Sequence, residues 1–292
     1  MPKKRSRSDE FLNNVVVVSD THCGCRLGLL PLEGTKVDEG NQFGPSRIQE
    51  ALFGHWQEFW GEFVPDATRK EPFAVVHNGD CIDGVHHGSV HQMSHNLQDQ
   101  ANIAHELMKP VVDLCDGRYF HIRGTEAHVG KSGQEEERLA QRLNSIPNED
   151  GQHARWELWL EIGQGLLHLM HHIGTTGSQA YEATAVHKEL NESYVESARF
   201  GERPPDCIVR SHRHRYLQTG IATERGNGFA VVTPGWQGKT PFAWKVAGAR
   251  LSQPQFGGVV IRFAHNRLFC DAKVWVPGRS KSERLTCEAR SP

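Results

Sequence analysis

Two kinds of hydrophobic pattern alternate along the first two thirds of the chain. Apolar runs without polar alternation, rich in β-branched residues, predict strands that are covered on both faces. These runs lie at 14–19, 73–77, 119–122 and 207–210. Between them, apolar residues recur at helical spacing and predict helices over 47–63, 97–115, 134–144 and 179–198. A tight turn at 163–165 predicts a hairpin of two further strands, at 156–162 and 166–170.

The last third of the chain is mostly strand. Short apolar segments predict strands at 216–221, 229–232, 259–263 and 268–274, with turns at Asn227-Gly228 and Asn266-Arg267. Residues 23–45 are rich in Gly, Pro and Leu and predict a long surface loop. The whole pattern predicts an α/β fold, a two-sheet β-sandwich flanked by helices. We expect one domain over 11–277, with a disordered tail at 1–10 and a flexible tail at 278–292.

Composition narrows the class of protein. The 33 Lys and Arg nearly balance the 35 Asp and Glu, which argues against a broad nucleic-acid-binding face but leaves a local basic groove open. The seven cysteines are scattered, without a zinc-ribbon or disulfide framework. No apolar run is long enough for a membrane span, and no apolar stretch follows the basic start. We therefore expect a cytoplasmic protein that does not bind membranes.

Metal-ligating residues stand where the predicted strands end, and the 18 histidines raise the expectation of a metal site. Residues i and i+2 of a strand point to the same side, and sites in α/β sheets form beyond the carboxyl ends of strands. One such Asp or His alone is usually a turn former, a helix cap or a surface residue. Six at strand ends together predict a metal site: Asp20 and His22, Asp80, His171 (or His172), and His212 and His214.

The donor types indicate which ions would bind. Carboxylates and imidazoles without thiolates suit Mn²⁺, Fe, Zn²⁺ or Ni²⁺ better than Ca²⁺. Six ligands are too many for one tetrahedral ion, so we expect two divalent ions. Asp80 stands alone on its strand between the two pairs and is the expected bridge.

Together these motifs resemble the calcineurin-like metallophosphoesterase superfamily: Asp20-x-His22, Gly79-Asp80, a Gly-x-x-x-His segment from Gly124 to His128, His171, and His212-x-His214. The resemblance implies a sandwich of α-β-β-α layers with a dinuclear centre. We expect Mn²⁺ as its metal. It assigns Asp20, His22 and His214 to the first ion, His171 and His212 to the second, and Asp80 to both. It also implies hydrolysis of phosphoester bonds by a hydroxide held between the ions.

Two departures from the family pattern affect these assignments. The usual Gly-Asn-His is replaced by Gly124-Thr125-Glu126-Ala127-His128. Thr125, Glu126 or water must replace the asparagine ligand, and we favour Glu126 because a carboxylate is the stronger hard ligand. The resemblance makes His128 the proton donor to the leaving group, with two extra residues changing its reach. Ser211 stands where the family has Gly, which fits if the backbone there has a negative φ.

The sequence indicates less about the substrate than about the metal site. Arg123, Arg213 or His87 could bind a phosphate oxygen, and the loop 234–242 could stack a base or form a packed corner. We expect a phosphodiester or nucleotide substrate. A DNA or RNA nuclease of the same superfamily and a catalytically silent scaffold for protein binding are the alternatives. The variant motif resembles phage or prophage members, which would place the protein in the host cytoplasm.

Overall fold

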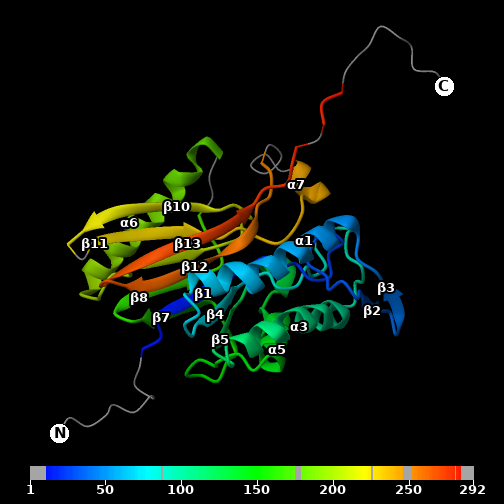
Figure 1. Cartoon of the computed structure of the whole chain (residues 1–292), viewed down its shortest axis with the longest axis horizontal. Coiled ribbons are helices and arrows are strands. Elements are labelled where there is room, and N and C mark those ends of the chain that lie inside the picture. Colours follow the sequence, from blue (N-terminus) through cyan, green and yellow to red (C-terminus); the bar gives the residue numbers. More distant parts are fainter. Residues whose placement is uncertain are drawn as a thin grey trace.

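Two mixed β-sheets pack face to face with helices on their outer sides (Figure 1), as a computed structural model shows for residues 11–86, 88–174, 179–224, 226–245, 252–279 and 281–283. The first sheet has the order β13 (Arg267–Trp275), β12 (Phe256–Ala264), β1 (Asn14–Val18), β4 (Ala74–Asn78), β5 (Tyr119–Ile122), β6 (Ala154–Arg155). The second has the order β10 (Leu217–Thr223), β11 (Gly226–Val232), β9 (Cys207–Arg210), β8 (Gly165–Met170), β7 (Glu157–Ile162). The predicted two-sheet α/β fold is confirmed.

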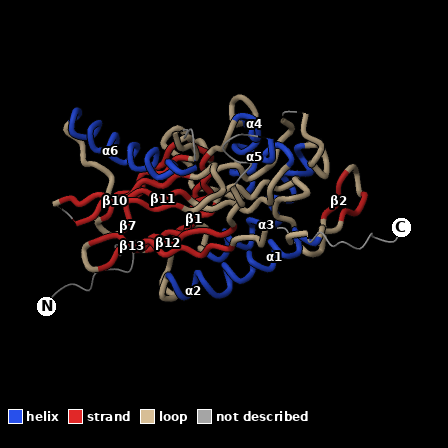
Figure 2. The backbone as a smooth tube through the Cα atoms, turned by 90° about the horizontal axis from the view of Figure 1, so that it is seen from above, coloured by secondary structure: helices blue, strands red, loops and turns tan. Residues whose placement is uncertain are grey.

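The helices occupy the intervals that the helical spacing indicated. They are α1 (Arg47–Glu58), continued by a π-helical turn (Phe59–Phe63) and α2 (Val64–Ala67), then α3 (Leu97–Leu114), α4 (Glu126–Val129), α5 (Gln134–Arg142), α6 (Glu182–Phe200) and α7 (Pro241–Lys245). A 3₁₀ turn (Gln179–Tyr181) precedes α6. Figure 2 shows α6 on one side of the strands and α1 with α2 on the other.

The central strand β1 explains how the layers are held together. Its side chains alternate between two faces. Val15 and Val17 lie in the apolar core between the two sheets, whereas Val16 and Val18 lie in the core beneath the helices. A strand buried on both faces needs apolar residues at every position, which accounts for the run of four valines. β1 pairs in parallel with β4 and antiparallel with β12.

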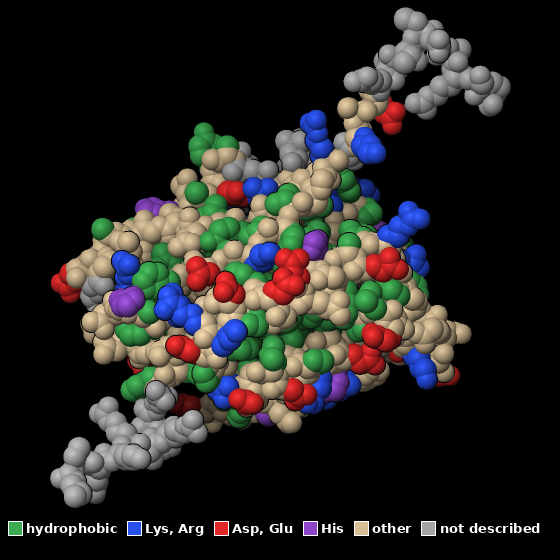
Figure 3. Space-filling view, in the orientation of Figure 1, with side chains coloured by type: hydrophobic (Ala, Val, Ile, Leu, Met, Phe, Trp, Pro, Cys, Tyr) green, Lys and Arg blue, Asp and Glu red, His purple; other side chains and the backbone are tan. Residues whose placement is uncertain are grey.

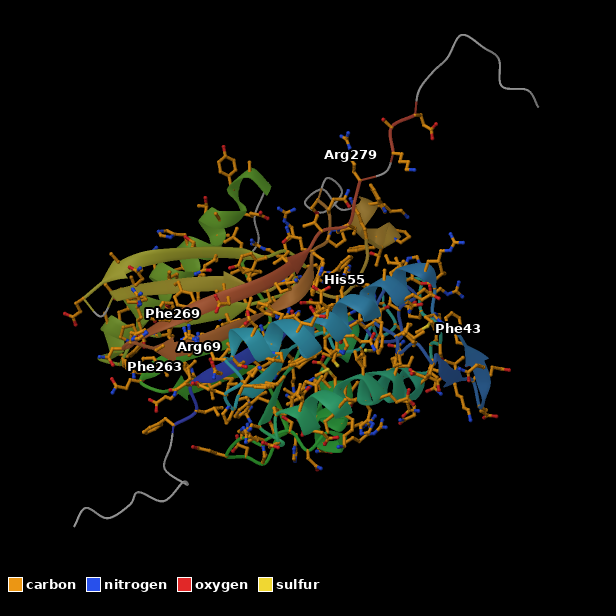
Figure 4. The ribbon with its side chains drawn as sticks, viewed as in Figure 1. Phe43, His55, Arg69, Phe263, Phe269 and Arg279 are labelled. Atoms are coloured by element: carbon orange, nitrogen blue, oxygen red, sulfur yellow. The ribbon has the colours of Figure 1, made fainter. Side chains whose placement is uncertain are left out.

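The helices are fixed to the sheets by local signals and by apolar packing. α1 begins at a capping box in which Ser46 and Gln49 satisfy each other's backbone N–H groups. His55 of α1, labelled in Figure 4, stacks on Trp275 of β13 with 4.6 Å between ring centroids. On the other side, Val186 and Leu190 of α6 pack on the second sheet.

Some local predictions were wrong. Asn227 and Gly228 lie inside β11 and do not form a turn. A Cβ atom at Gly228 would lie 2.2 Å from the hydroxyl oxygen of Tyr194, so the glycine permits α6 to approach the strand closely. The loop 23–45 contains the hairpin of β2 (Thr35–Val37) and β3 (Asn41–Phe43), and its Leu29 and Leu30 are fully buried. Apolar residues there serve packing as well as connection.

The structure describes only part of the two predicted tails. Residues 1–10 lie outside the described residues, and of 278–292 the structure describes 278, 279 and 281–283. The single-domain boundaries therefore stay predictions. Among the described residues, no helix has both the length and the apolar character that a membrane crossing needs.

Candidate metal centre

The ligand residues meet at one edge of the sandwich. β1, β4 and β5 run parallel in the first sheet, and β8 and β9 run parallel in the second. The residues after their carboxyl ends converge into two neighbouring groups of three, each with its ligand atoms within 4.8 Å of one another. All six residues expected from the strand ends belong to one of these groups.

The first group consists of Asp20, His22 and His214. Oδ1 of Asp20 lies 3.2 Å from Nε2 of His214 and 3.9 Å from Nε2 of His22. The two imidazole Nε2 atoms are 3.2 Å apart. Asp20 and His22 are buried, and His214 is partly exposed, so the group is open to solvent on the His214 side.

The second group consists of Asp80, His171 and His212. Oδ2 of Asp80 lies 2.9 Å from Nε2 of His171 and 3.9 Å from Nδ1 of His212. Asp80 also forms a group with His22 and His128, so it stands between the two sets as the expected bridge would. His171, rather than His172, contacts Asp80; His172 is exposed beside it.

Backbone strain is concentrated at the ligands. Five of the six have positive φ, a region that non-glycine residues rarely adopt: Asp20, His22, Asp80, His212 and His214. Gly124 is required nearby, because a Cβ atom there would lie 2.0 Å from Oδ1 of Asp80. Ser211 is not among the positive-φ residues, so serine fits at that position as expected.

The electrostatics of the two ligand groups together favour a positive charge between their side chains. Burial opposes ionisation of Asp20, yet the charge of His214, whose Nε2 lies 3.2 Å away, holds the pKa of that carboxyl below its usual value. Burial also opposes protonation of His171, yet the charge of Asp80 raises the pKa of His171 to about 10. A site that keeps carboxylates ionised and draws protons onto buried imidazoles has the electrostatics of a cation site.

A second layer of residues orients the histidines, as metal ligands require. Nδ1 of His171 donates to the backbone oxygen of Asn78 at 2.7 Å, which leaves Nε2 available to a cation. Nδ1 of His22 lies 3.2 Å from Oδ1 of Asp83. Sequence reasoning missed Asp83, although its position three residues after Asp80 in the same loop was an available signal.

Thr125, and not Glu126, lies at the second group. Its Oγ1 is 3.1 Å from Oδ2 of Asp80, 3.1 Å from Nδ1 of His212 and 3.4 Å from Nε2 of His171. Glu126 begins the single turn of α4, is exposed, and belongs to none of the ligand groups found among the described residues. This placement does not support the preference for Glu126, because its side chain is exposed and lies outside the groups that the described residues form.

Substituting Thr125 and Glu126 in separate variants tests this reassignment. Thr125→Val removes the hydroxyl at nearly constant volume and should weaken binding of one divalent ion about 10-fold, within the range for polar groups at metal sites. Glu126→Gln should leave the affinity unchanged. Equilibrium dialysis of Mn²⁺ against both variants gives the comparison; a loss in Glu126→Gln alone would restore the original preference.

His128 reaches the centre despite the two extra residues. The turn of α4 places its ring edge-on to His22, with 4.6 Å between centroids. Nδ1 donates to the backbone oxygen of Asp83 at 2.6 Å, which leaves Nε2 free to face the site. Burial lowers the pKa of His128 to about 4, partly offset by the charge of Asp80. The imidazole is therefore neutral at neutral pH before an anionic ligand enters the cleft.

The other residues expected to contact the substrate differ in where the structure places them. Arg123 is buried and pairs with Glu137, so it has a structural role. Arg213 lines the site but donates to the backbone oxygens of Gly174 and Glu182. His87 lies outside the described residues. Trp236, in the loop suggested for base stacking, is fully buried against Trp56 and is part of the core.

A cleft of about 620 Å³ opens over both ligand groups. Its lining includes the acidic and polar Asp80, Thr125 and His128 as well as the basic Arg213, Arg215 and Lys239. Arg215 forms a two-point ion pair with Glu182 of α6. The cleft thus joins a candidate cation site to basic side chains, an arrangement suited to an anionic ligand.

Comparisons with known proteins give structural likeness only. No family model matches the sequence, and no curated protein matches it significantly. An archaeal phosphodiesterase aligns over 89% of this chain and 99% of its own, with 10% identity and a TM-score of 0.41. Zinc-bound Vps29 from Entamoeba histolytica aligns over 90% of this chain and 98% of its own, with 8% identity and a TM-score of 0.36. Likeness this distant says nothing about activity.

The residues present fit divalent cations. Oδ1 of Asp20 is buried and has no well-aligned hydrogen bond within the described residues, although three imidazole nitrogens lie within 4.0 Å of it. Mixed carboxylate and imidazole donors suit Mn²⁺, Fe or Zn²⁺. Asp20, His22 and His214 would hold one ion, and Asp80, His171, His212 and Thr125 a second.

Proposed function

We propose that the protein is a metal-dependent phosphodiesterase of the calcineurin-like metallophosphoesterase superfamily. The observation that carries the proposal is the pair of adjacent ligand groups, with Asp80 between them, on the floor of one cleft. When bound, two divalent ions would offset the repulsion between an anionic phosphoester and an anionic nucleophile, and would lower the pKa of a water molecule.

The chain's own residues hold and orient this centre. The second-layer contacts of His22 and His171 fix which ring nitrogen faces inward. Burial of Asp20, Asp80 and His171 keeps bulk water away from the floor, while the partly exposed His212 and His214 leave the cleft side open. An anion can therefore approach from the cleft side, beside His212 and His214, which favours one orientation of the reacting groups.

His128 is the proposed proton donor to the leaving group. Its Nδ1 proton is engaged by a backbone oxygen, so the exchangeable proton belongs to Nε2. An anionic phosphate beside Nε2 favours the imidazolium, because a nearby negative charge raises a histidine pKa. Binding of the substrate thus supplies the condition under which His128 can donate.

The charge of the molecule favours a small phosphodiester or a nucleotide over long DNA. The formal net charge is −2. On the face shown in Figure 3, acidic and basic side chains are interspersed, without a broad basic surface. The charge of Arg215 is paired with the carboxylate of Glu182, whereas Arg213 donates to the backbone oxygen of the same residue. The remaining attraction is local to the cleft.

Hydrolysis of two chromogenic esters tests the proposal. The metal-free protein, reloaded with Mn²⁺, should hydrolyse bis-p-nitrophenyl phosphate faster than p-nitrophenyl phosphate, and EDTA should remove both activities. Single-stranded and duplex DNA in the same assay decide whether the diesterase is a nuclease. Absence of turnover with Mn²⁺, Fe²⁺, Zn²⁺ and Ni²⁺ would instead favour a silent protein-binding scaffold.

A further inference from the structure

A third group of ligand residues lies beside the two described above. Asp83, His86 and His128 offer ligand atoms within 4.8 Å of one another. Nε2 of His86 lies 3.7 Å from Oδ2 of Asp83, and the rings of His86 and His128 are edge-on with 4.4 Å between centroids. All three residues line the cleft, so a cation in solution can reach them.

The loop that carries Asp83 and His86 is held against α4 at Gly84. Gly84 has positive φ, and a Cβ atom there would lie 2.2 Å from the backbone oxygen of His128, so only glycine lets the loop approach α4 this closely. Its N–H donates to Oε1 of Gln100 at 2.7 Å. Such a fixed loop presents its side chains in one arrangement, which favours metal binding because little ordering is needed.

The Asp83 carboxylate is oriented but not saturated. It is 2% exposed, accepts from Gln92 at Oδ2 (2.6 Å) and from Gln237 at Oδ1 (3.0 Å). Each carboxylate oxygen has two lone pairs, so Oδ2 can accept from Gln92 and still bind a cation. At His128, the Nδ1 contact with the backbone leaves Nε2 as the ligand atom.

We propose that Asp83, His86 and His128 form a third, inhibitory cation site with a preference for Zn²⁺. Two imidazoles and one carboxylate, with water as fourth ligand, are a typical tetrahedral zinc set. An ion at this site binds Nε2 of His128 and removes the proposed proton donor. It also lies on the Asp83 carboxylate that faces His22, which links it to the first ligand group.

The inhibitory effect rests on the proposed function, whereas the binding itself does not. The site therefore predicts two separate observations. The full-length protein should bind three Zn²⁺, one more weakly than the others. The phosphodiesterase activity of the Mn²⁺-loaded enzyme should fall as added Zn²⁺ fills the weak site.

His86→Asn is the test variant and His91→Asn the matched control. His91 lines the same cleft but belongs to none of the ligand groups that the described residues form. Equilibrium dialysis of the metal-free full-length proteins should give three bound Zn²⁺ for the wild type and for His91→Asn, and two for His86→Asn. Relative to its own zinc-free rate, His86→Asn should need at least about 10-fold more Zn²⁺ for half-inhibition, as expected for loss of a metal-site residue.

The outcomes separate the two proposals. A wild type that binds fewer than three Zn²⁺, or an His86→Asn variant that still binds three, overturns the third site whatever the activity. Three ions in the wild type and two in the variant, without hydrolysis of any diester, retain the third site and overturn the proposed function. Circular dichroism of both variants checks that they are folded.

Discussion

Asp80→Asn is expected to abolish hydrolysis and to weaken metal binding at both ligand groups. Asp80 is 1% exposed, contacts His171, and accepts from the backbone N–H and the hydroxyl of Thr125. The change removes the charge between the two groups while asparagine still tolerates the positive φ of this position. Loss of several kcal/mol of charge stabilisation corresponds to a fall of about 10³-fold or more in rate. The measurements are Mn²⁺ affinity and diester hydrolysis.

Asp116→Asn is the matched control. Asp116 also has positive φ and precedes β5, but its side chain is exposed and pairs with Arg118. An exposed ion pair contributes little to stability. This variant should keep full metal affinity and activity. If Asp80→Asn retained both as well, Asp80 would not lie between two ions and the dinuclear proposal would fail.

The convergence of the strand-end residues was predictable because the strands that carry them have a strong sequence signal. Residues 15–18 are all valine, and a run buried on both faces has few other structural solutions. Once the strands are placed, their parallel carboxyl ends must meet. This reasoning located Asp20, Asp80 and His171 without any knowledge of side-chain positions, and the structure brings them together.

The residues around the ligands were not predictable in the same way. The choice between Thr125 and Glu126 depends on whether α4 starts before or after the ligand position, and helix boundaries are uncertain by one or two residues. Trp236 stands in a loop rich in Gly and Pro, so local sequence suggests exposure; only the packing of distant Trp56 and Phe59 against it determines its burial. Contacts between segments far apart in sequence leave no local pattern.

Glu136 is a further residue that the sequence does not reveal. A glutamate in the first turn of a helix is ordinary, because it favours the positive end of the helix dipole. In the structure its side chain is fully buried and bridges two loops. Oε1 accepts from the N–H of Cys81 at 2.8 Å, and Oε2 accepts from the N–H of Gly124 at 2.6 Å. These backbone groups adjoin Asp80 and Thr125, so one carboxylate holds both ligand loops in place.

Glu136→Gln is therefore expected to lower Mn²⁺ affinity about 10–100-fold, the usual effect of removing a group that positions metal ligands. The amide has one acceptor oxygen, so its NH₂ group must face one of the two backbone N–H groups. A buried polar group left without a partner costs about 1–3 kcal/mol. Thermal unfolding and Mn²⁺ dialysis should both respond.

The neighbouring Glu137 separates positioning from general stability. It accepts from the backbone N–H groups of His153 and Ala154 at 2.9 and 2.8 Å and pairs with Arg123, so it performs the same kind of bridging at β6 and is in none of the ligand groups of the described residues. Glu137→Gln should lower the melting temperature while leaving Mn²⁺ affinity intact. Equal losses of affinity in both variants would mean that Glu136 acts only through overall stability. A loss confined to Glu136→Gln would show that a buried carboxylate outside the ligand set determines how well the two loops hold their cations.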